Sequence, residues 1–82
     1  MIQLEEQLTT TNVVKLWEKH DELFLSNIVD LTKVDEIDSS GIAFLVLWAK
    51  KLESKKLKIK VVDGKIKKWL ELFSIGELFE FV

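Results

Sequence analysis

The residues with the most chemical information are Asp38-Ser39-Ser40-Gly41, which precede an apolar segment. Asp38 or Ser39 can accept hydrogen bonds from the free N–H groups of a first helical turn, which is an ordinary helix cap. A phosphoryl group on a serine hydroxyl there would lie at the positive end of the helix dipole and would add about −1.5 to −2 charge. The tetrapeptide therefore predicts either a structural cap or the centre of a binding or phosphorylation site.

Few other side chains support chemistry. The sequence has no cysteine, which excludes thiolate zinc sites and thiol nucleophiles, and its one histidine, His20, does not support a Ser-His-Asp triad. Asp35, Glu36 and Asp38 lie close together, but a turn cap explains them better than a metal site. Lysines without any arginine do not favour nucleic-acid binding, and Asp63-Gly64-Lys65 is not a glycine-rich phosphate loop. We therefore expect no enzymatic activity, no cofactor and no nucleic-acid partner.

The length and the charge limit the class of protein further. Eighty-two residues predict one domain over residues 1–82. Residues 50–68 contain nine of the twelve lysines and carry a net charge of +7, whereas the remainder carries −9, so the total is −2. This basic segment could face anionic lipid, but no Trp or Phe lies among its lysines, which favours a solvated rim. The N-terminal residues lack the pattern of a secretion signal, so we expect a cytoplasmic protein.

Hydrophobic periodicity predicts short strands that alternate with helices. The expected strands cover residues 2–8, 28–31, 57–62 and 78–82, with a turn at Asp63-Gly64. The expected helices cover residues 11–22, 42–53 and 66–73, the last of them ending near Gly76. The order β-α-β-α-β-α-β predicts an α/β fold, a small and mostly parallel sheet with helices that cover one face better than the other.

The helix expected over residues 42–53 is apolar on both sides. Its core side comprises Ile42, Leu45, Trp48, Ala49 and Leu52. The opposite side should be polar in a one-faced helix, yet it contains Ala43, Phe44 and Leu47. Because a chain of this size has little material for a second layer, we expect these residues to form an exposed, partner-binding patch. Trp69 is expected in the core.

The segment from Val29 to Ile42, with the sequence VDLTKVDEIDSSGI, resembles the central signature of STAS domains. The likeness covers about residues 2–80 and is greatest to the MlaB-like STAS subunits, which accompany the ATPase of the Mla phospholipid-transport ABC complex. It implies a STAS-type fold and a non-enzymatic subunit, peripheral to the inner membrane, that binds this ATPase. Such a subunit supports the maintenance of outer-membrane lipid asymmetry and contacts the membrane only through the complex.

The resemblance also implies site residues. In anti-sigma factor antagonists, a kinase-type anti-sigma factor phosphorylates the first serine of the motif, which is Ser39 here. In MlaB-like subunits a hydroxyl residue at this place contacts the ATPase, so both alternatives rest on Ser39. The implied partner interface comprises Trp17, Asp38, Ser39, Ser40, Gly41, Ala43, Phe44 and Leu47. The first strand is short, which leaves a sheet edge through which two copies of the chain could pair as a homodimer.

Overall fold

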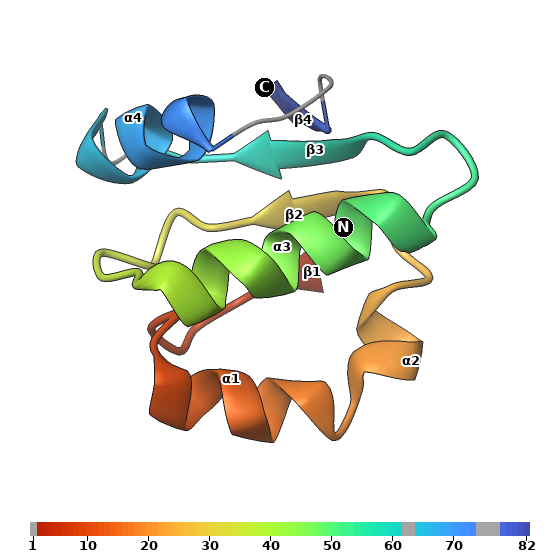
Figure 1. Cartoon of the computed structure of the whole chain (residues 1–82), viewed down its shortest axis with the longest axis horizontal. Coiled ribbons are helices and arrows are strands. Elements are labelled where there is room, and N and C mark those ends of the chain that lie inside the picture. The colour runs from red at the N-terminus through yellow and green to blue at the C-terminus, as the bar shows by residue number, and fades with distance from the viewer. Residues whose placement is uncertain (1, 62–63, 74–77) are drawn as a thin grey trace.

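The computed structural model describes residues 2–61, 64–73 and 78–82. In chain order these residues form β1 (Ile2–Gln3), α1 (Thr10–Trp17), α2 (His20–Leu23), β2 (Ile28–Asp30), α3 (Ser39–Lys51), β3 (Leu57–Lys60), α4 (Gly64–Leu72) and β4 (Phe79–Phe81). The strands make one all-parallel sheet in the order β1-β2-β3-β4 (Figure 1). The predicted α/β fold with a parallel sheet is therefore confirmed.

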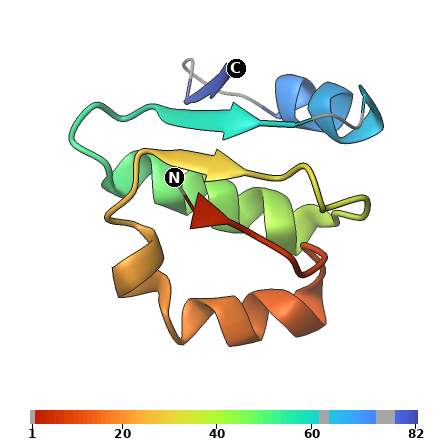
Figure 2. The same cartoon turned by 180° about the vertical axis from the view of Figure 1, so that it is seen from behind.

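The helices lie on one side of this sheet. Each connection leads to the next strand along the sheet, so right-handed crossovers place the connecting helices on the same face. Figure 2 shows β1, β2 and β3 from behind, with α3 beyond them and no helix in front. The paired residues Val29 and Ile59 are buried, whereas Lys58 and Lys60 are exposed. The unequal covering of the two faces was predicted correctly, and these two lysines are the outward residues of β3.

Helix α3 supplies the centre of the core. The side predicted to be buried, together with the residue after the helix, is buried throughout: Ile42, Leu45, Trp48, Ala49 and Leu52. The fully buried indole of Trp48 donates a hydrogen bond from Nε1 to the carbonyl oxygen of Ser26, at 2.8 Å. Its polar atom is thus satisfied, as a buried tryptophan requires. The helix begins at Ser39, earlier than predicted, because Asp38 caps it.

The helix predicted over residues 11–22 is divided into α1 and α2. In a continuous α-helix the carbonyl of Trp17 would accept a hydrogen bond from the N–H of Asp21. Here that carbonyl accepts a hydrogen bond from Nδ1 of His20, at 2.6 Å. The N–H groups of residues 18–19 donate to carbonyls three positions back, which is the pattern of a tightened last turn. A side chain has thus replaced a backbone donor and ended α1.

The strands are shorter than predicted. β1 ends at Gln3, and Leu8 forms an isolated parallel bridge with Ile37 outside the four strands. β3 ends at Lys60, and Gly64 is the first residue of α4 instead of part of a turn. Three further predictions concern residues outside the described ranges. They are the end of the third strand at Val62, the turn at Asp63 and the end of the last helix near Gly76.

Candidate partner-binding site

The aspartate of the Asp-Ser-Ser-Gly motif connects the starts of α1 and α3. Its Oδ1 accepts hydrogen bonds from the backbone N–H groups of Ser40 (2.9 Å) and Gly41 (3.1 Å), so Asp38 is the N-cap of α3. Its Oδ2 accepts hydrogen bonds from the N–H (2.9 Å) and Oγ1 (3.1 Å) of Thr10, the first residue of α1. Thr9, the N-cap residue of α1, makes no side-chain cap bond. One carboxylate therefore caps both helices.

These bonds change the acidity of Asp38. The backbone N–H of Thr10 is the largest cause that lowers the pKa of Asp38 below its ordinary value of 3.8, and the N–H groups of Gly41 and Ser40 add to it, while desolvation opposes them. The side chain is consequently ionised at neutral pH. A negative charge at this place is favourable because the positive ends of two helix dipoles meet there.

Removing this double cap should destabilise the chain. In Asp38→Ala both helix ends lose their side-chain acceptor, and we expect Tm to fall by roughly 4–8 °C. Asp38→Asn keeps one carbonyl oxygen and should lower Tm less. Circular dichroism melts of the three proteins measure this order. A Tm of Asp38→Ala equal to that of the wild type would contradict the role of Asp38 as a cap.

The cap should also be sensitive to acid. Because the pKa of Asp38 is lower in the folded chain, its ionised form contributes stability that is complete above the unfolded value near 3.8 and is lost as the pH falls through the folded value. The Tm difference between the wild type and Asp38→Asn should therefore shrink below about pH 4. The pKa of Asp30 is lowered as well, so acid destabilises both proteins and only their difference isolates Asp38. A difference that stays constant down to about pH 3 would contradict this assignment.

The two serines of the motif have different surroundings. Ser40 is partly buried, and its Oγ lies 3.0 Å from Oγ1 of Thr10, so the two hydroxyls are hydrogen-bonded. Ser39 is exposed, and its hydroxyl makes no hydrogen bond to any residue that the structure describes. Ser39 is thus the more accessible hydroxyl for a partner or a kinase. The predicted roles of Ser39, as a contact to the partner or as a phosphorylation site, stay predictions.

Gly41 is the last residue of the motif. It is buried, and a Cβ at this position would lie 2.2 Å from the carbonyl oxygen of Leu8 and 2.8 Å from Cγ1 of Ile37. The carbonyl of Leu8 accepts a hydrogen bond from the N–H of Asp38, and the N–H of Leu8 donates one to the carbonyl of Glu36, both at 3.0 Å. Gly41 therefore has a packing role, because it lets the chain at Leu8 approach the start of α3. Its place in the partner interface stays a prediction.

A shallow apolar groove runs between α1 and α3. Its lining comprises Val13, Val14 and Trp17 from α1 and Ser40, Ala43, Phe44 and Leu47 from α3. Val14 is 62% exposed, Trp17 44% and Leu47 42%. The apolar surface predicted beside the serines is therefore present at Ala43 and Leu47. The contribution of Val13 and Val14 was not predicted, because it depends on the packing of α1 against α3.

Phe44 corrects the prediction of a fully exposed patch. It is only 2% exposed, so it forms the floor of the groove and part of the core. Its ring packs edge-on against Trp17 and Trp48, with centroid distances of 6.5 Å and 6.1 Å, and lies 5.5 Å from the ring of Phe24. The chain does supply a second layer, because α1 and α2 lie beside α3 on this side (Figure 1).

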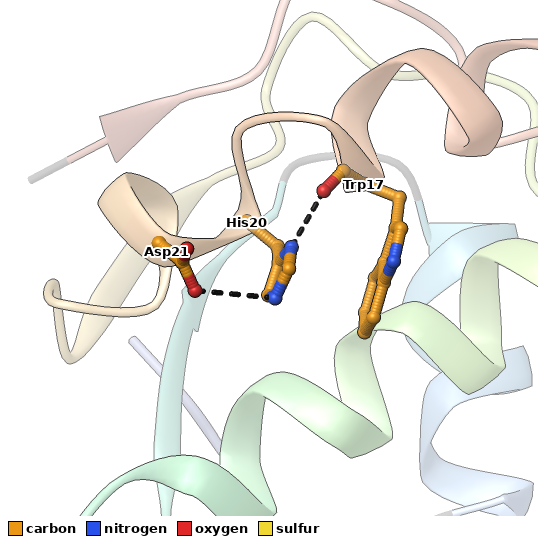
Figure 3. A network of polar contacts seen from close by, with 3 residues as sticks. All are labelled: Trp17, His20 and Asp21. Atoms are coloured by element: carbon orange, nitrogen blue, oxygen red, sulfur yellow. Dashed lines mark hydrogen bonds and ion pairs between the residues drawn. The ribbon is translucent and has the colours of Figure 1, made fainter.

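Trp17 is fixed in place by its neighbours. The rings of Trp17 and His20 stack at 3.9 Å with an interplanar angle of 6°. Figure 3 shows how His20 is held: Nδ1 donates to the carbonyl of Trp17, and Nε2 lies 3.2 Å from Oδ1 of Asp21. Trp17, an implied interface residue, lies between the core and the surface, because its ring packs on the buried Phe44 and is still half-exposed. A rigid, half-exposed aromatic ring loses little conformational entropy when a partner covers it.

Asp30, the aspartate of the Val-Asp-Leu strand end, has a structural role. It is 6% exposed and accepts hydrogen bonds from the N–H of Thr32 (2.8 Å) and from Nε2 of Gln3 (3.4 Å). The hydrogen bonds from Thr32 are the largest causes that lower the pKa of Asp30, and the nearby charge of Lys60 also contributes. Asp30 therefore connects β1 to the turn that follows β2.

The turn before the motif is held by its backbone. The backbone N–H groups of Asp35 and Glu36 both donate to Oε1 of Gln7, at 2.9 Å. Among residues 2–61, 64–73 and 78–82, no group of three or more His, Cys, Asp or Glu side chains could hold a metal ion. Within the same ranges, every helix is too short or too polar to cross a lipid bilayer.

Together, the fold and the site define a class of protein. A parallel sheet with helices on one face, and an Asp-Ser-Ser-Gly start of α3 beside a groove, form a STAS-type domain. A family model described as "Mlab, STAS domain" matches residues 1–80, so the chain belongs to the MlaB-like STAS family. Neither a curated protein nor a solved structure matches the chain. Domains of this family are small regulatory or accessory domains and are generally non-catalytic.

Proposed function

We propose that this chain is the accessory subunit that binds the ATPase of a phospholipid-transport ABC complex. In this role it is a cytoplasmic protein, peripheral to the inner membrane, that performs no chemistry and supports a system that maintains outer-membrane lipid asymmetry. Membership of the MlaB-like family supports this proposal. The observation on which it mainly rests is the exposed apolar groove between α1 and α3, whose lining includes Ser40, the neighbour in sequence of the exposed Ser39.

The groove suggests how the subunit holds its partner. Val14, Trp17 and Leu47 offer exposed apolar surface, and burying such surface is worth about 25 cal/mol per Å² before the costs of association. Trp17 is the natural anchor, since tryptophans at the centre of an interface contribute most to affinity. Ser39 lies outside the groove lining on the first turn of α3, where its hydroxyl can exchange hydrogen bonds with the partner.

One observation favours a second candidate function, that of an anti-sigma factor antagonist switched by phosphorylation. Ser39 is the exposed hydroxyl of the pair, whereas Ser40 is already bonded to Thr10. A phosphate on Ser39 would lie beside the N-terminus of α3 but also close to the ionised carboxylate of Asp38. Repulsion between these charges would weaken the double cap and release a kinase-type anti-sigma factor bound to the unmodified chain.

Affinity purification of the tagged chain from detergent-solubilised membranes of its source cell separates the two functions. We expect an ABC ATPase and its membrane subunits to co-elute, and mass spectrometry to find Ser39 unmodified. Recovery of a sigma-factor kinase without any ABC ATPase, together with phosphoserine at Ser39, would overturn the leading proposal in favour of the second.

A further inference from the structure

Helix α4 presents a second exposed apolar face. Trp69 is 41% exposed, Leu72 80% and Phe73, the residue after the helix, 47%. The rings of Trp69 and Phe73 stack at a centroid distance of 6.2 Å. The prediction that Trp69 lies in the core is wrong, because Ile66 and Leu70, one helical turn apart, occupy the buried side of α4 and leave Trp69 facing outward.

Lysines border one side of this face. A shallow hollow beside Trp69 is lined by Gly64, Lys65, Lys68, Trp69 and Leu72, without an acidic residue. On the other side of Trp69, a separate hollow includes Asp35 and Glu36 in its lining. The hollow beside Leu72 and Lys68 is therefore apolar and basic, and the exposed Glu71 of α4 lines neither hollow.

This face is separate from the groove. In both Figure 1 and Figure 2, α1 lies past the β1 edge of the sheet, whereas α4 lies beyond the end of β3, with α3 between the two helices. The two linings also share no residue. A protein bound in the groove between α1 and α3 can therefore leave α4 uncovered.

We infer that α4 docks on an anionic lipid bilayer, with Trp69, Leu72 and Phe73 entering the interface and Lys68 lying at the headgroups. Aromatic and leucine side chains beside lysines are the composition of interfacial helices. Three side chains are few for the roughly 800 Å² per partner that a stable protein interface buries, whereas a fluid bilayer needs no matching shape. Helix α4 carries Lys65, Lys67 and Lys68 against Glu71, a net charge of +2, whereas the rest of the sequence carries −4, so an anionic surface attracts this helix and repels the remainder.

The inference goes beyond the proposed function and does not depend on it. Binding through one short helix is weak by itself. If the groove holds a subunit of a membrane complex, the bilayer is already close, and the second contact acts at a high effective concentration. Binding to lipid and binding to the ATPase then reinforce each other without sharing residues.

Sedimentation of the full chain with lipid vesicles tests the inference. The probes are vesicles of phosphatidylcholine alone and of phosphatidylcholine mixed with phosphatidylglycerol, each at low and at physiological salt. We expect binding to the anionic vesicles only, and weaker binding at the higher salt. Leu72→Glu should reduce the partition coefficient on the order of tenfold, and Lys68→Gln about fivefold. Both residues are exposed, so folding should be unaffected, as circular dichroism can verify.

A matched control uses another exposed leucine. Leu25 is 85% exposed and lines neither the hollow beside Trp69 nor the groove. Leu25→Glu should therefore bind vesicles like the wild type. Leu47→Asp should also keep vesicle binding, which distinguishes a failure of this inference from a failure of the proposed function. Equal binding to neutral vesicles, no effect of Leu72→Glu, or no vesicle binding at all would overturn the inference. A dimer in solution that Leu72→Glu abolishes, without vesicle binding, would instead assign the face to a second copy of the chain.

Discussion

Alanine in place of Gly41 is expected to remove much of the stability of the chain. The new methyl group would meet the carbonyl oxygen of Leu8 at 2.2 Å and its Cβ at 2.7 Å. Such overpacking costs about 1–3 kcal/mol or more, whereas the better helix propensity of alanine returns only about 1 kcal/mol. Moving Leu8 away would also break the two backbone hydrogen bonds that form its bridge to Ile37. We expect the free energy of unfolding in urea to fall by about 3 kcal/mol.

Gly64 provides the control for this substitution. It is the first residue of α4, and a Cβ there would have no neighbour within 4 Å. Gly64→Ala should therefore be neutral or stabilise the chain by up to about 1 kcal/mol. If Gly41→Ala and Gly64→Ala unfolded at the same urea concentration, the close approach of Leu8 to Gly41 would not contribute to the stability of the chain.

The second large effect concerns partner binding. Leu47 is 42% exposed in the groove, so Leu47→Asp should keep the fold while it places a charge in an apolar contact. We expect affinity for the proposed partner, an ABC ATPase, to fall by at least about 30-fold, equivalent to about 2 kcal/mol, in a titration of the purified proteins. Phe44→Ala differs, because this side chain is 2% exposed, and it should lower the free energy of unfolding by about 3–5 kcal/mol.

Leu25→Asp is the matched control for binding. It introduces the same charge at a more exposed leucine outside the groove, so affinity should stay within about twofold of the wild type. Two results would count against the groove as the binding surface: full affinity in Leu47→Asp, or an equal loss of affinity in Leu25→Asp.

The features that were predicted correctly depend on neighbours along the chain. The buried side of α3 follows from helical spacing, which brings Ile42, Leu45 and Trp48 to one side whatever packs on them. The cap by Asp38 follows from the residues two and three positions ahead. The parallel order of the sheet follows from helices too long to be hairpin turns. Local spacing thus determined the fold class and the position of the motif.

The features that were missed depend on contacts between distant segments. Phe44 is buried because α1 and α2 pack beside it, and α1 ends where His20 takes the carbonyl of Trp17, a side-chain bond without a sequence pattern. The second bond of Asp38, to Thr10, joins residues 28 positions apart. Trp69 has the spacing of a core residue, but α4 is short and its buried side is filled by Ile66 and Leu70.

The shared carboxylate between α1 and α3 has a consequence for recognition. Helix α1 has eight residues, and an isolated helix of that length is not stable in water. It takes its cap from Asp38 and packs against α3, so the two walls of the groove stabilise each other. The groove is consequently a property of the whole folded chain. A partner that binds this surface would therefore select folded copies of the chain over unfolded ones.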